Sequence, residues 1–265
     1  MSSTVSAPGE ASGLPVGDLP GRATITTNLA VPAVALAIGA HPDDVEFGCG
    51  ATLAKWAAAG CIIHHLVLTD GSKGTWAPED DREALILRRQ REQQAAASIL
   101  GGGAVTFLGF VDGELHAGLD ERRAVCEVIR AVKPDVVIGH DPWRRYRLHP
   151  DHRHAGWLTT DGVVAARDHR FFPDAGPPHR PAALLLFEPD EPNHVEDVTD
   201  FEQRKVAALL AHASQHRSTM GIEDEDDSAR AAFAAKVRAQ LAAHGALAGL
   251  QAGEAFHLIA GAEVG

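Results

Sequence analysis

Two short clusters of histidine and aspartate are the residues most able to do chemistry in this chain. They are His41-Pro42-Asp43-Asp44 and His149-Pro150-Asp151-His152, which lie about a hundred residues apart. Imidazole and carboxylate groups are ligands that zinc and iron take together in catalytic sites, where a water or the substrate fills the remaining position. The clusters therefore predict a metal centre with an open position, of a kind that activates water.

Three residues of the clusters are predicted to hold the ion. His41 and Asp44 can face one ion from a single tight loop, and His152 adds a third ligand from the second cluster. Two histidines, one carboxylate and a water form the open site of a catalytic zinc rather than the closed site of a structural one. Zinc is the predicted cofactor, and ferrous iron is an alternative for the same donors.

The other residues of the clusters are then free for catalysis. Asp43 is predicted to act as the general base, which takes a proton as the water attacks. His149 is placed to protonate the leaving amine or to hold the developing oxyanion. Asp151 fits as the carboxylate that orients a histidine ligand.

The segments around the clusters predict the fold that positions them. Apolar runs of strand length alternate with helical patterns, which predicts an α/β, Rossmann-like fold with a mostly parallel sheet and helices on both faces. The predicted strands are 33–38, 62–68, 104–108, 135–139 and 183–187, and the predicted helices are 48–59, 81–100, 119–132, 152–167, 201–214 and 226–243.

A sheet of this kind also explains how the two clusters can meet. Ligands bind beyond the carboxyl ends of the strands, at the point where the strand order reverses. With the common order 3-2-1-4-5, the first and fourth strands are neighbours at that point. His41 follows the first strand, while His140 and the second cluster follow the fourth. The fold therefore supplies a physical reason for residues distant in sequence to converge.

The composition of the chain restricts its partners. A chain of 265 residues, 45% of them hydrophobic, can bury the core of one large domain. A formal net charge of −12 and a pI near 5.6 argue against nucleic acid or an anionic membrane as the main partner. No apolar run approaches 18 residues, so no integral membrane span is predicted. A small-molecule substrate is expected, and a homo-oligomer is compatible with this composition.

The composition of the N-terminal segment and the pattern of cysteines allow two further predictions. Residues 1–28 are rich in serine, glycine and proline, and we expect a flexible leader without the shape of a signal peptide. Cys49, Cys61 and Cys126 show no CxxC pairing, which is typical of free thiols in a reducing cytoplasm. A cytoplasmic location is therefore predicted.

Other interpretations of the clusters remain open. The first cluster alone could be a strand-to-helix turn with capping aspartates, and the second could be a helix start capped by Asp151. Two such clusters at strand ends of one sheet are much less expected by chance. A non-catalytic metal- or nucleotide-binding module is a further alternative, although no G-x-G-x-x-G motif follows the first strand.

The clusters resemble the two signatures of the PIG-L/LmbE-like zinc-dependent N-deacetylase family, which includes the de-N-acetylases of glycosylphosphatidylinositol and mycothiol biosynthesis. Ala40–Asp44 is similar to the first signature and His149–His152 to the second, and the similarity extends from about residue 33 to 260. The resemblance implies a single LmbE-like deacetylase domain over residues 29–265, with a helical C-terminal part at about 200–245. It implies the same ligands, base and acid as the chemistry above.

The resemblance also implies an activity. Members of the family are metal-dependent amidohydrolases, so we expect removal of an N-acetyl or related N-acyl group from an amino sugar or a glycosylated small metabolite. An amidase of thiol S-conjugates, of the mycothiol-conjugate type, is the alternative within the family.

Weaker similarities extend the site toward the substrate. Arg89 with Glu92 matches the family's R-x-x-E pattern, which implies an arginine that points into the pocket and grips sugar hydroxyls or a phosphate. From the residues alone, Arg89 reads equally well as part of an exposed basic helix face. Asp112-Gly113 and His212–Gln215 are also similar to family segments, but they read as a turn and as helix packing and capping.

Two further residues are assigned to substrate binding. Mycothiol deacetylases place a tyrosine two residues before the first histidine of the second signature, where this chain has Arg147. The single tyrosine, Tyr146, could still be delivered to the pocket by its loop, which carries three arginines. His257 is expected to close the pocket from the C-terminal part of the chain.

Overall fold

The computed structural model describes residues 25–223, 227–261 and 264. The predicted leader lies outside the described residues as far as residue 24. All five predicted strands are present within two residues of their predicted ends. They are β2 (Val34–Gly39), β3 (Ile62–Thr69), β4 (Ala104–Phe110), β5 (Val136–His140) and β6 (Ala183–Phe187).

The helices follow the predicted alternation. They are α1 (Asp44–Ala58), α2 (Arg82–Leu100), α3 (Leu119–Val132), α4 (Pro150–Arg167), α5 (Glu202–Leu210) and α6 (Asp227–Ala246). The first helix begins four residues earlier than predicted, because Asp44 and Glu46 place acidic groups in its first turn, where the helix dipole favours them. Asp44 is therefore presented from a helix N-terminus rather than from a free loop.

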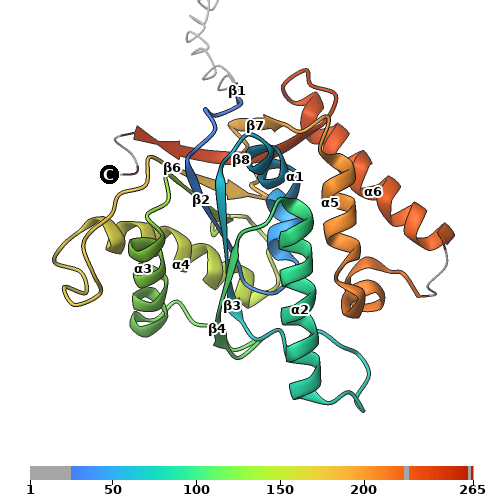
Figure 1. Ribbon diagram of the computed structural model, residues 1–265, viewed down its shortest axis with the longest axis horizontal. Coiled ribbons are helices and arrows are strands. Elements are labelled where there is room, and N and C mark those ends of the chain that lie inside the picture. The colour runs from blue at the N-terminus through green and yellow to red at the C-terminus, as the bar shows by residue number, and fades with distance from the viewer. Residues whose placement is uncertain (1–24, 224–226, 262–263, 265) are drawn as a thin grey trace, which may run out of the picture.

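The strands form a mostly parallel sheet whose order runs β1-β7-β8-β6-β5-β2-β3-β4 (Figure 1). Read from β6 to β4, this is the predicted order in which the first and fourth strands of the series, β2 and β5, are neighbours. Ala35, Leu36 and Ala37 of β2 pair with β5 in parallel register. The switch point therefore lies between these two strands, as expected from the sequence.

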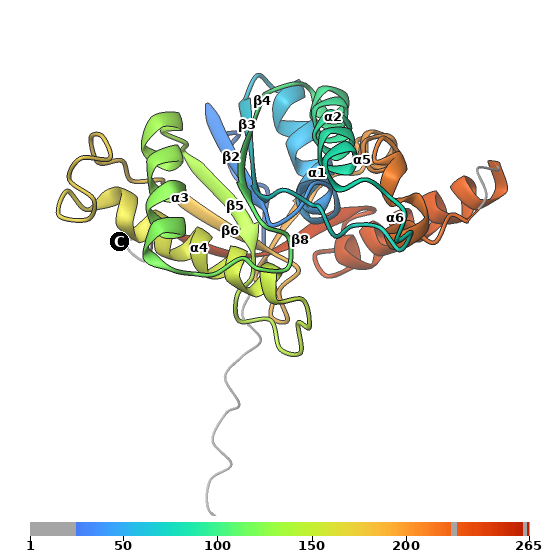
Figure 2. The same ribbon diagram turned by 90° about the horizontal axis from the view of Figure 1, so that it is seen from below.

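Helices cover both faces of the sheet (Figure 2). Alternate residues of each central strand point to opposite faces, so Ala35 and Ala37 pack under α1 and α2 while Leu36 and Ile38 pack under α3 and α4. Both faces are apolar and buried, which is why these strands read as continuous hydrophobic runs. The predicted Rossmann-like class is confirmed.

One edge of the sheet was not predicted. β7 (His194–Asp197) and β8 (Gly253–Ala260) pair antiparallel with each other, and β8 also pairs antiparallel with β6. The two-residue strand β1 (Thr26–Thr27) adds to β7, so the last residues of the predicted leader contact the sheet. These strands depend on pairing between segments that are distant in sequence, which periodicity within one segment does not reveal.

The C-terminal helical part packs around its own apolar cluster. Val206 and Leu209 of α5 contact Phe233, Val237 and Leu241 of α6 in this cluster. The helix predicted over 201–214 ends at Leu210, and a 3-10 turn at Ala213–Gln215 and a π-helical turn at His216–Met220 follow it. Among the described residues, no helix combines the length and apolar character needed to span a bilayer.

Candidate active site

The loop between β2 and α1 holds its backbone in a strained conformation. Asp43 has a φ of 99°, in the left-handed region that a non-glycine residue occupies at a cost of about 1–3 kcal/mol. Two contacts fix it there. The backbone N–H of Asp43 donates to Gln93 Oε1 at 3.0 Å, and Arg89 donates to the carbonyl of Pro42 at 2.7 Å. Helix α2 therefore clamps the residue predicted to be the base.

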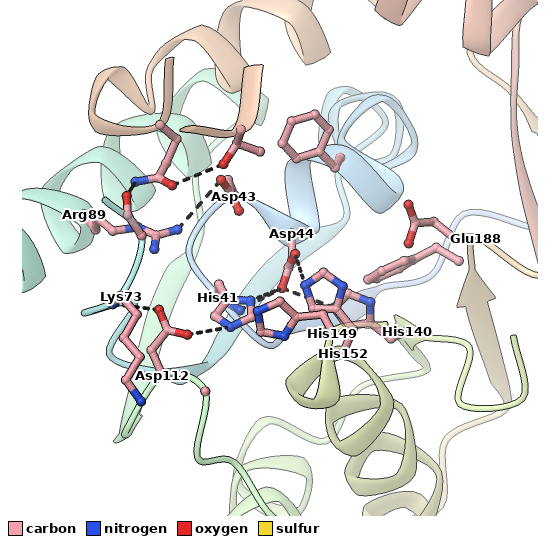
Figure 3. A pocket seen from close by; sticks show the side chains of 16 residues that line it. His41, Asp43, Asp44, Lys73, Arg89, Asp112, His140, His149, His152 and Glu188 are labelled. Atoms are coloured by element: carbon pink, nitrogen blue, oxygen red, sulfur yellow. Dashed lines mark hydrogen bonds and ion pairs between the residues drawn. The ribbon is translucent and has the colours of Figure 1, made fainter. Parts of the chain in front are cut away.

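The predicted metal ligands converge on one point (Figure 3). His41 Nδ1 lies 3.3 Å from Asp44 Oδ2, and His152 Nε2 lies 3.2 Å from Asp44 Oδ1. Ligand atoms at the corners of a tetrahedron with zinc bonds near 2.0–2.1 Å are separated by about 3.3 Å. One atom from each of the three residues falls within 4.8 Å of the others, so the set fits a single ion.

The second ring nitrogen of His41 faces two carboxylates. Its Nε2 lies 3.1 Å from Asp151 Oδ2 and 3.2 Å from Asp112 Oδ1. Burial alone would lower the pKa of His41, but Asp112, Asp151 and Asp44 raise it well above its usual value. Carboxylates in this position hold the proton on Nε2 and leave the Nδ1 lone pair for a metal. The three carboxylates therefore favour a positive charge at His41, either on its ring or on a bound cation.

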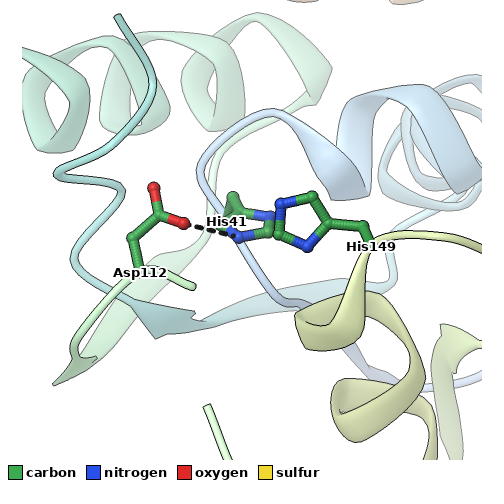
Figure 4. Close-up of side chains that lie close together, drawn as sticks. All are labelled: His41, Asp112 and His149. Atoms are coloured by element: carbon green, nitrogen blue, oxygen red, sulfur yellow. Dashed lines mark ion pairs between the residues drawn. The ribbon is translucent and has the colours of Figure 1, made fainter. Parts of the chain in front are cut away.

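His41 also belongs to a second group of possible metal ligands, together with Asp112 and His149 (Figure 4). This group uses the Nε2 side of His41, where Asp112 lies 3.2 Å away. Asp151, which is fully buried and also accepts the Gly113 N–H at 2.6 Å, already occupies that nitrogen. The group of His41, Asp44 and His152 is therefore the better metal site.

Asp44 is held in its ionised form by the surrounding histidines. Burial would raise its pKa, but His152 and His140 lower the pKa well below the ordinary value. His140 Nε2 lies 3.2 Å from Asp44 Oδ2. The same oxygen accepts a hydrogen bond from the backbone N–H of His41 at 2.7 Å. These contacts leave Oδ1 directed toward His152.

Asp43 lies beside this group with a different electrostatic environment. Burial, together with the nearby negative charge of Asp44, raises the pKa of Asp43 to about 6, although Arg89 opposes the shift. The Arg89 guanidinium lies 3.8 Å from Asp43 Oδ2. A raised carboxylate pKa suits a group that accepts and returns a proton near neutral pH.

A buried polar chain runs behind Asp43. Gln93 Nε2 donates to Glu46 Oε1 at 2.7 Å, and Glu46 Oε2 lies 3.4 Å from His212 Nε2. Glu46 and His212 are both completely buried. Their part in the site was missed from the sequence, where Glu46 was not singled out and His212 was interpreted as helix packing.

One cavity of about 460 Å³, a size typical of small-ligand sites, is lined by Asp43 and by the three predicted ligands His41, Asp44 and His152. Arg89 lines it and is 3% exposed, so it is not part of the exposed basic helix face, to which Arg88 and Arg91 do belong. Asp112 also lines the cavity, so the interpretation of Asp112-Gly113 as a plain turn was incomplete. The remaining lining residues include Phe47, Lys73, His149, Phe187 and Glu188.

The two other residues assigned to substrate binding lie elsewhere. Tyr146 is 92% exposed at a φ of 58° and does not line this cavity. His257 lines a separate hollow with Asp141 and Trp143, where its Nδ1 faces the carbonyl of Glu191 at 2.9 Å. Arg147, at the position of the mycothiol-enzyme tyrosine, is buried behind the histidines, 3.1 Å from His140 Nδ1 and 3.2 Å from His152 Nδ1.

Known proteins are similar to this chain over much of its length. Residues 36–163 match the PIG-L family of GlcNAc-PI de-N-acetylases. Diacetylchitobiose deacetylase of Thermococcus kodakarensis is 38% identical over 184 residues, which cover 68% of this chain and 69% of that enzyme. A 1D-myo-inositol 2-acetamido-2-deoxy-alpha-D-glucopyranoside deacetylase of Rhodococcus opacus is 34% identical over 175 residues, covering 56% of this chain and 59% of the other.

A solved structure extends the match over most of the fold. The N,N'-diacetylchitobiose deacetylase from Pyrococcus horikoshii, complexed with its inhibitor MPG, superposes with a TM-score of 0.78 and 27% sequence identity. The match covers 86% of this chain and 84% of that one. We conclude that the chain belongs to the PIG-L family and is a hydrolytic N-deacetylase.

Proposed function

We propose that this protein uses zinc to remove an N-acetyl group, or a related N-acyl group, from an amino sugar or a glycosylated small metabolite. The observation that carries the proposal is the buried carboxylate of Asp43 beside the converging group of His41, Asp44 and His152, in one cavity. The names of the similar enzymes, which describe deacetylases of diacetylchitobiose and of an acetamido sugar of inositol, support the substrate class.

The proposed metal ligands are His41, Asp44 and His152. An ion held there supplies Lewis acidity, which polarises the amide carbonyl and lowers the pKa of a water molecule. Zinc suits two imidazoles and one carboxylate, and ferrous iron suits them too. Asp151 and Asp112 serve as the carboxylates that fix the ring of His41, through contacts of 3.1 and 3.2 Å.

Asp43 is the proposed general base. As the water oxygen bonds to the acyl carbon, Asp43 accepts the proton that the water loses. The C–N bond then breaks, and the amine nitrogen takes up a proton from His149 or from Asp43. The products are a carboxylate and a free amine. Arg89 keeps Asp43 in place from one side, and Gln93 holds its backbone from the other.

A cytoplasmic location is part of the proposal. The three cysteines Cys49, Cys61 and Cys126 are free and buried, and buried free thiols are typical of a reducing compartment. Substrate contacts by Tyr146 and His257 remain predictions, because neither residue lines the cavity. Tyr146 lies on a loop that would have to move, and His257 lies within strand β8, where it pairs with Leu186 of β6.

The test is a substrate panel for the zinc-loaded protein. N-acetylated amino sugars and a thiol S-conjugate are incubated with the enzyme, and free amine and acetate are measured. We expect acetate and amine in equal amounts from at least one N-acetyl amino sugar, and about 10²–10⁴-fold slower release with zinc-loaded Asp43→Asn. Cleavage of the thiol conjugate alone would favour the amidase alternative. No hydrolysis at full zinc loading would favour a non-catalytic module.

A further inference from the structure

One wall of the cavity is formed by Phe187 and Glu188, where β6 ends. Glu188 has a φ of 56°, again in the left-handed region that a non-glycine residue occupies at a cost. Its side chain is 34% exposed and lines the same cavity as the metal ligands (Figure 3). A strained residue that faces a catalytic cavity needs strong contacts to hold it, and Glu188 has them.

Two arginines anchor Glu188 through one oxygen only. Arg147 Nη2 forms a short contact with Glu188 Oε2, and Arg144 Nη1 lies 3.1 Å from the same atom. No donor within the described part of the chain contacts Glu188 Oε1. Arg147 is 9% exposed and is itself fixed against His140 and His152. Glu188 thus lines the cavity with its carboxylate held in place through Oε2 and with the acceptor capacity of Oε1 free.

The charges around Glu188 select the kind of group that Oε1 can bind. Burial alone would raise the pKa of Glu188, but Arg147, His140 and Arg144 lower it below the ordinary value, so the carboxylate accepts hydrogen bonds and does not donate. The group of Arg144, Arg147 and Glu188 carries a net charge of about +1, which does not favour a cationic ligand. A neutral O–H donor is the fitting partner.

The neighbouring surface agrees with a sugar ring. Phe47 and Phe187 line the cavity beside Glu188 and offer apolar surface to the C–H groups of a pyranose. Phe187 is firmly seated, because a Cβ at Gly48 would lie 2.6 Å from its ring, so only glycine allows the helix to pass this closely. An apolar wall with one fixed acceptor is the arrangement that orients a polyhydroxylated ring.

We propose that Glu188 is a specificity-determining residue, whose free Oε1 accepts a hydrogen bond from a ring hydroxyl of the sugar substrate. This inference rests on the proposed deacetylase function and narrows it to substrates that carry a hydroxyl within reach of this wall. Arg147, which stands where mycothiol enzymes have a tyrosine, anchors Glu188 and lies behind the reacting groups.

The test combines Glu188→Gln with two substrates that share an amide. One is N-acetylglucosamine, and the other is N-cyclohexylacetamide, which has a six-membered ring and no hydroxyls. In the variant, the arginines hold the amide oxygen, and an NH₂ group replaces the acceptor that faces the cavity. We expect kcat/KM for the sugar to fall about tenfold or more, mainly through KM, and kcat/KM for the cyclohexyl amide to stay the same.

The matched control is Asp190→Asn, which removes a charge from the same loop. Asp190 contacts Arg145 and lines the separate hollow rather than the catalytic cavity. This variant should have the same kcat/KM as wild type for both substrates. Bound zinc is measured in every variant, because Arg147 also contacts His152. An equal loss for both substrates, or no loss for either, would overturn the role of Glu188.

Direct binding separates this inference from the proposed function. If the zinc-loaded wild type hydrolyses neither these two compounds nor any sugar of the substrate panel, the activity proposal fails, and NMR titration with N-acetylglucosamine still tests the contact. Weaker binding of the sugar by Glu188→Gln than by wild type and Asp190→Asn would support the inference. Equal binding by all three proteins, or no binding by the wild type, would contradict it.

Discussion

Two clusters of interacting side chains in this molecule contain similar residue types but differ in what surrounds them. The site cluster comprises His41, Asp43, Asp44, Asp112, Asp151 and His152 at the carboxyl ends of the parallel strands. The edge cluster comprises Thr26, Lys55, His194 and Glu196 beside β1 and β7. In the edge cluster, the ring of His194 lies between the Thr26 hydroxyl at 2.8 Å and the Glu196 carboxylate at 2.9 Å. By group order alone, this resembles a hydrolase triad.

The difference lies in how the charges are compensated. Glu196 is paired with Lys55 at 2.6 Å and also accepts the Leu29 N–H at 2.7 Å, so its charge is matched. In the site cluster, Asp43 lies 3.8 Å from Arg89. Within the described residues, however, no lysine or arginine forms an ion pair with Asp44, Asp112 or Asp151. Their carboxylates gather around histidines on a cavity. Unmatched negative charge that faces a cavity indicates a cation site, whereas a matched buried cluster indicates stabilisation of the fold.

The sharpest way to break this comparison is to remove one histidine from each cluster. His152→Ala should lose bound zinc and lower deacetylation by about a thousandfold or more, because metal catalysis contributes several kcal/mol at the transition state. Metal analysis and amine release measure both effects. His194→Ala is the control from the edge cluster, and it should lower stability while the folded protein keeps its zinc and specific activity. Loss of zinc in both variants would contradict the distinction.

The next largest effect is expected within the site cluster itself. Asp43→Asn keeps the size of the side chain and the backbone contact to Gln93, but it removes the proton acceptor. We expect kcat to fall by about 10²–10⁴-fold, as for loss of a general base, with zinc content unchanged. Steady-state kinetics with parallel metal analysis provide the measurement. A variant that keeps full activity would show that another group takes the proton.

Much of the site cluster could be predicted because one rule of the fold governs it. The carboxyl ends of neighbouring parallel strands meet at one edge, so His41 after β2 and His140 at the end of β5 had to be close. The same rule places Asp112 after β4 and Glu188 after β6 in the cavity. Neither residue was assigned to the site from the sequence, because Asp112-Gly113 was interpreted as an ordinary turn and Glu188 belonged to no recognised motif.

Other features depend on contacts that the sequence does not display. The left-handed backbone of Asp43 is maintained by Gln93 and Arg89 from a distant helix, and aspartate rarely adopts this conformation unaided. The edge strands β7 and β8 become visible only through their antiparallel pairing. Local patterns therefore predicted the parallel centre of the sheet, but not the elements that long-range pairing defines.

A smaller effect is expected from the carboxylate behind His41. Asp151→Asn leaves the three proposed ligands in place but replaces the acceptor that holds the proton on His41 Nε2. Loss of such a contact weakens metal affinity by about 10–100-fold. Competition with a zinc chelator measures this change. Asp161→Asn, on the exposed side of the same helix and paired with Arg122, should have no effect on affinity. Equal affinities in Asp151→Asn and wild type would remove Asp151 from the site.

The smallest expected effect is a pH-dependent loss of stability on substitution in the edge cluster. Burial alone would raise the pKa of Glu196, but His194 and Lys55 lower it below its ordinary value. A lowered carboxylate pKa contributes stability above the unfolded-state pKa of about 4.3, and this stability is lost as the pH falls through the folded-state pKa. Glu196→Gln should therefore cost about 2 kcal/mol near neutral pH and progressively less below about pH 4.

Urea denaturation of both proteins across this pH range measures the difference, and zinc content and specific activity serve as the readouts for the site cluster. We expect both to be unchanged in the folded variant, because the charge of Glu196 is already matched by Lys55 at the far edge of the sheet. A stability difference that stays constant with pH would mean that packing, and not ionisation, accounts for the role of Glu196. A loss of specific activity would mean that the edge cluster is coupled to the site, and that charge matching does not separate the two clusters.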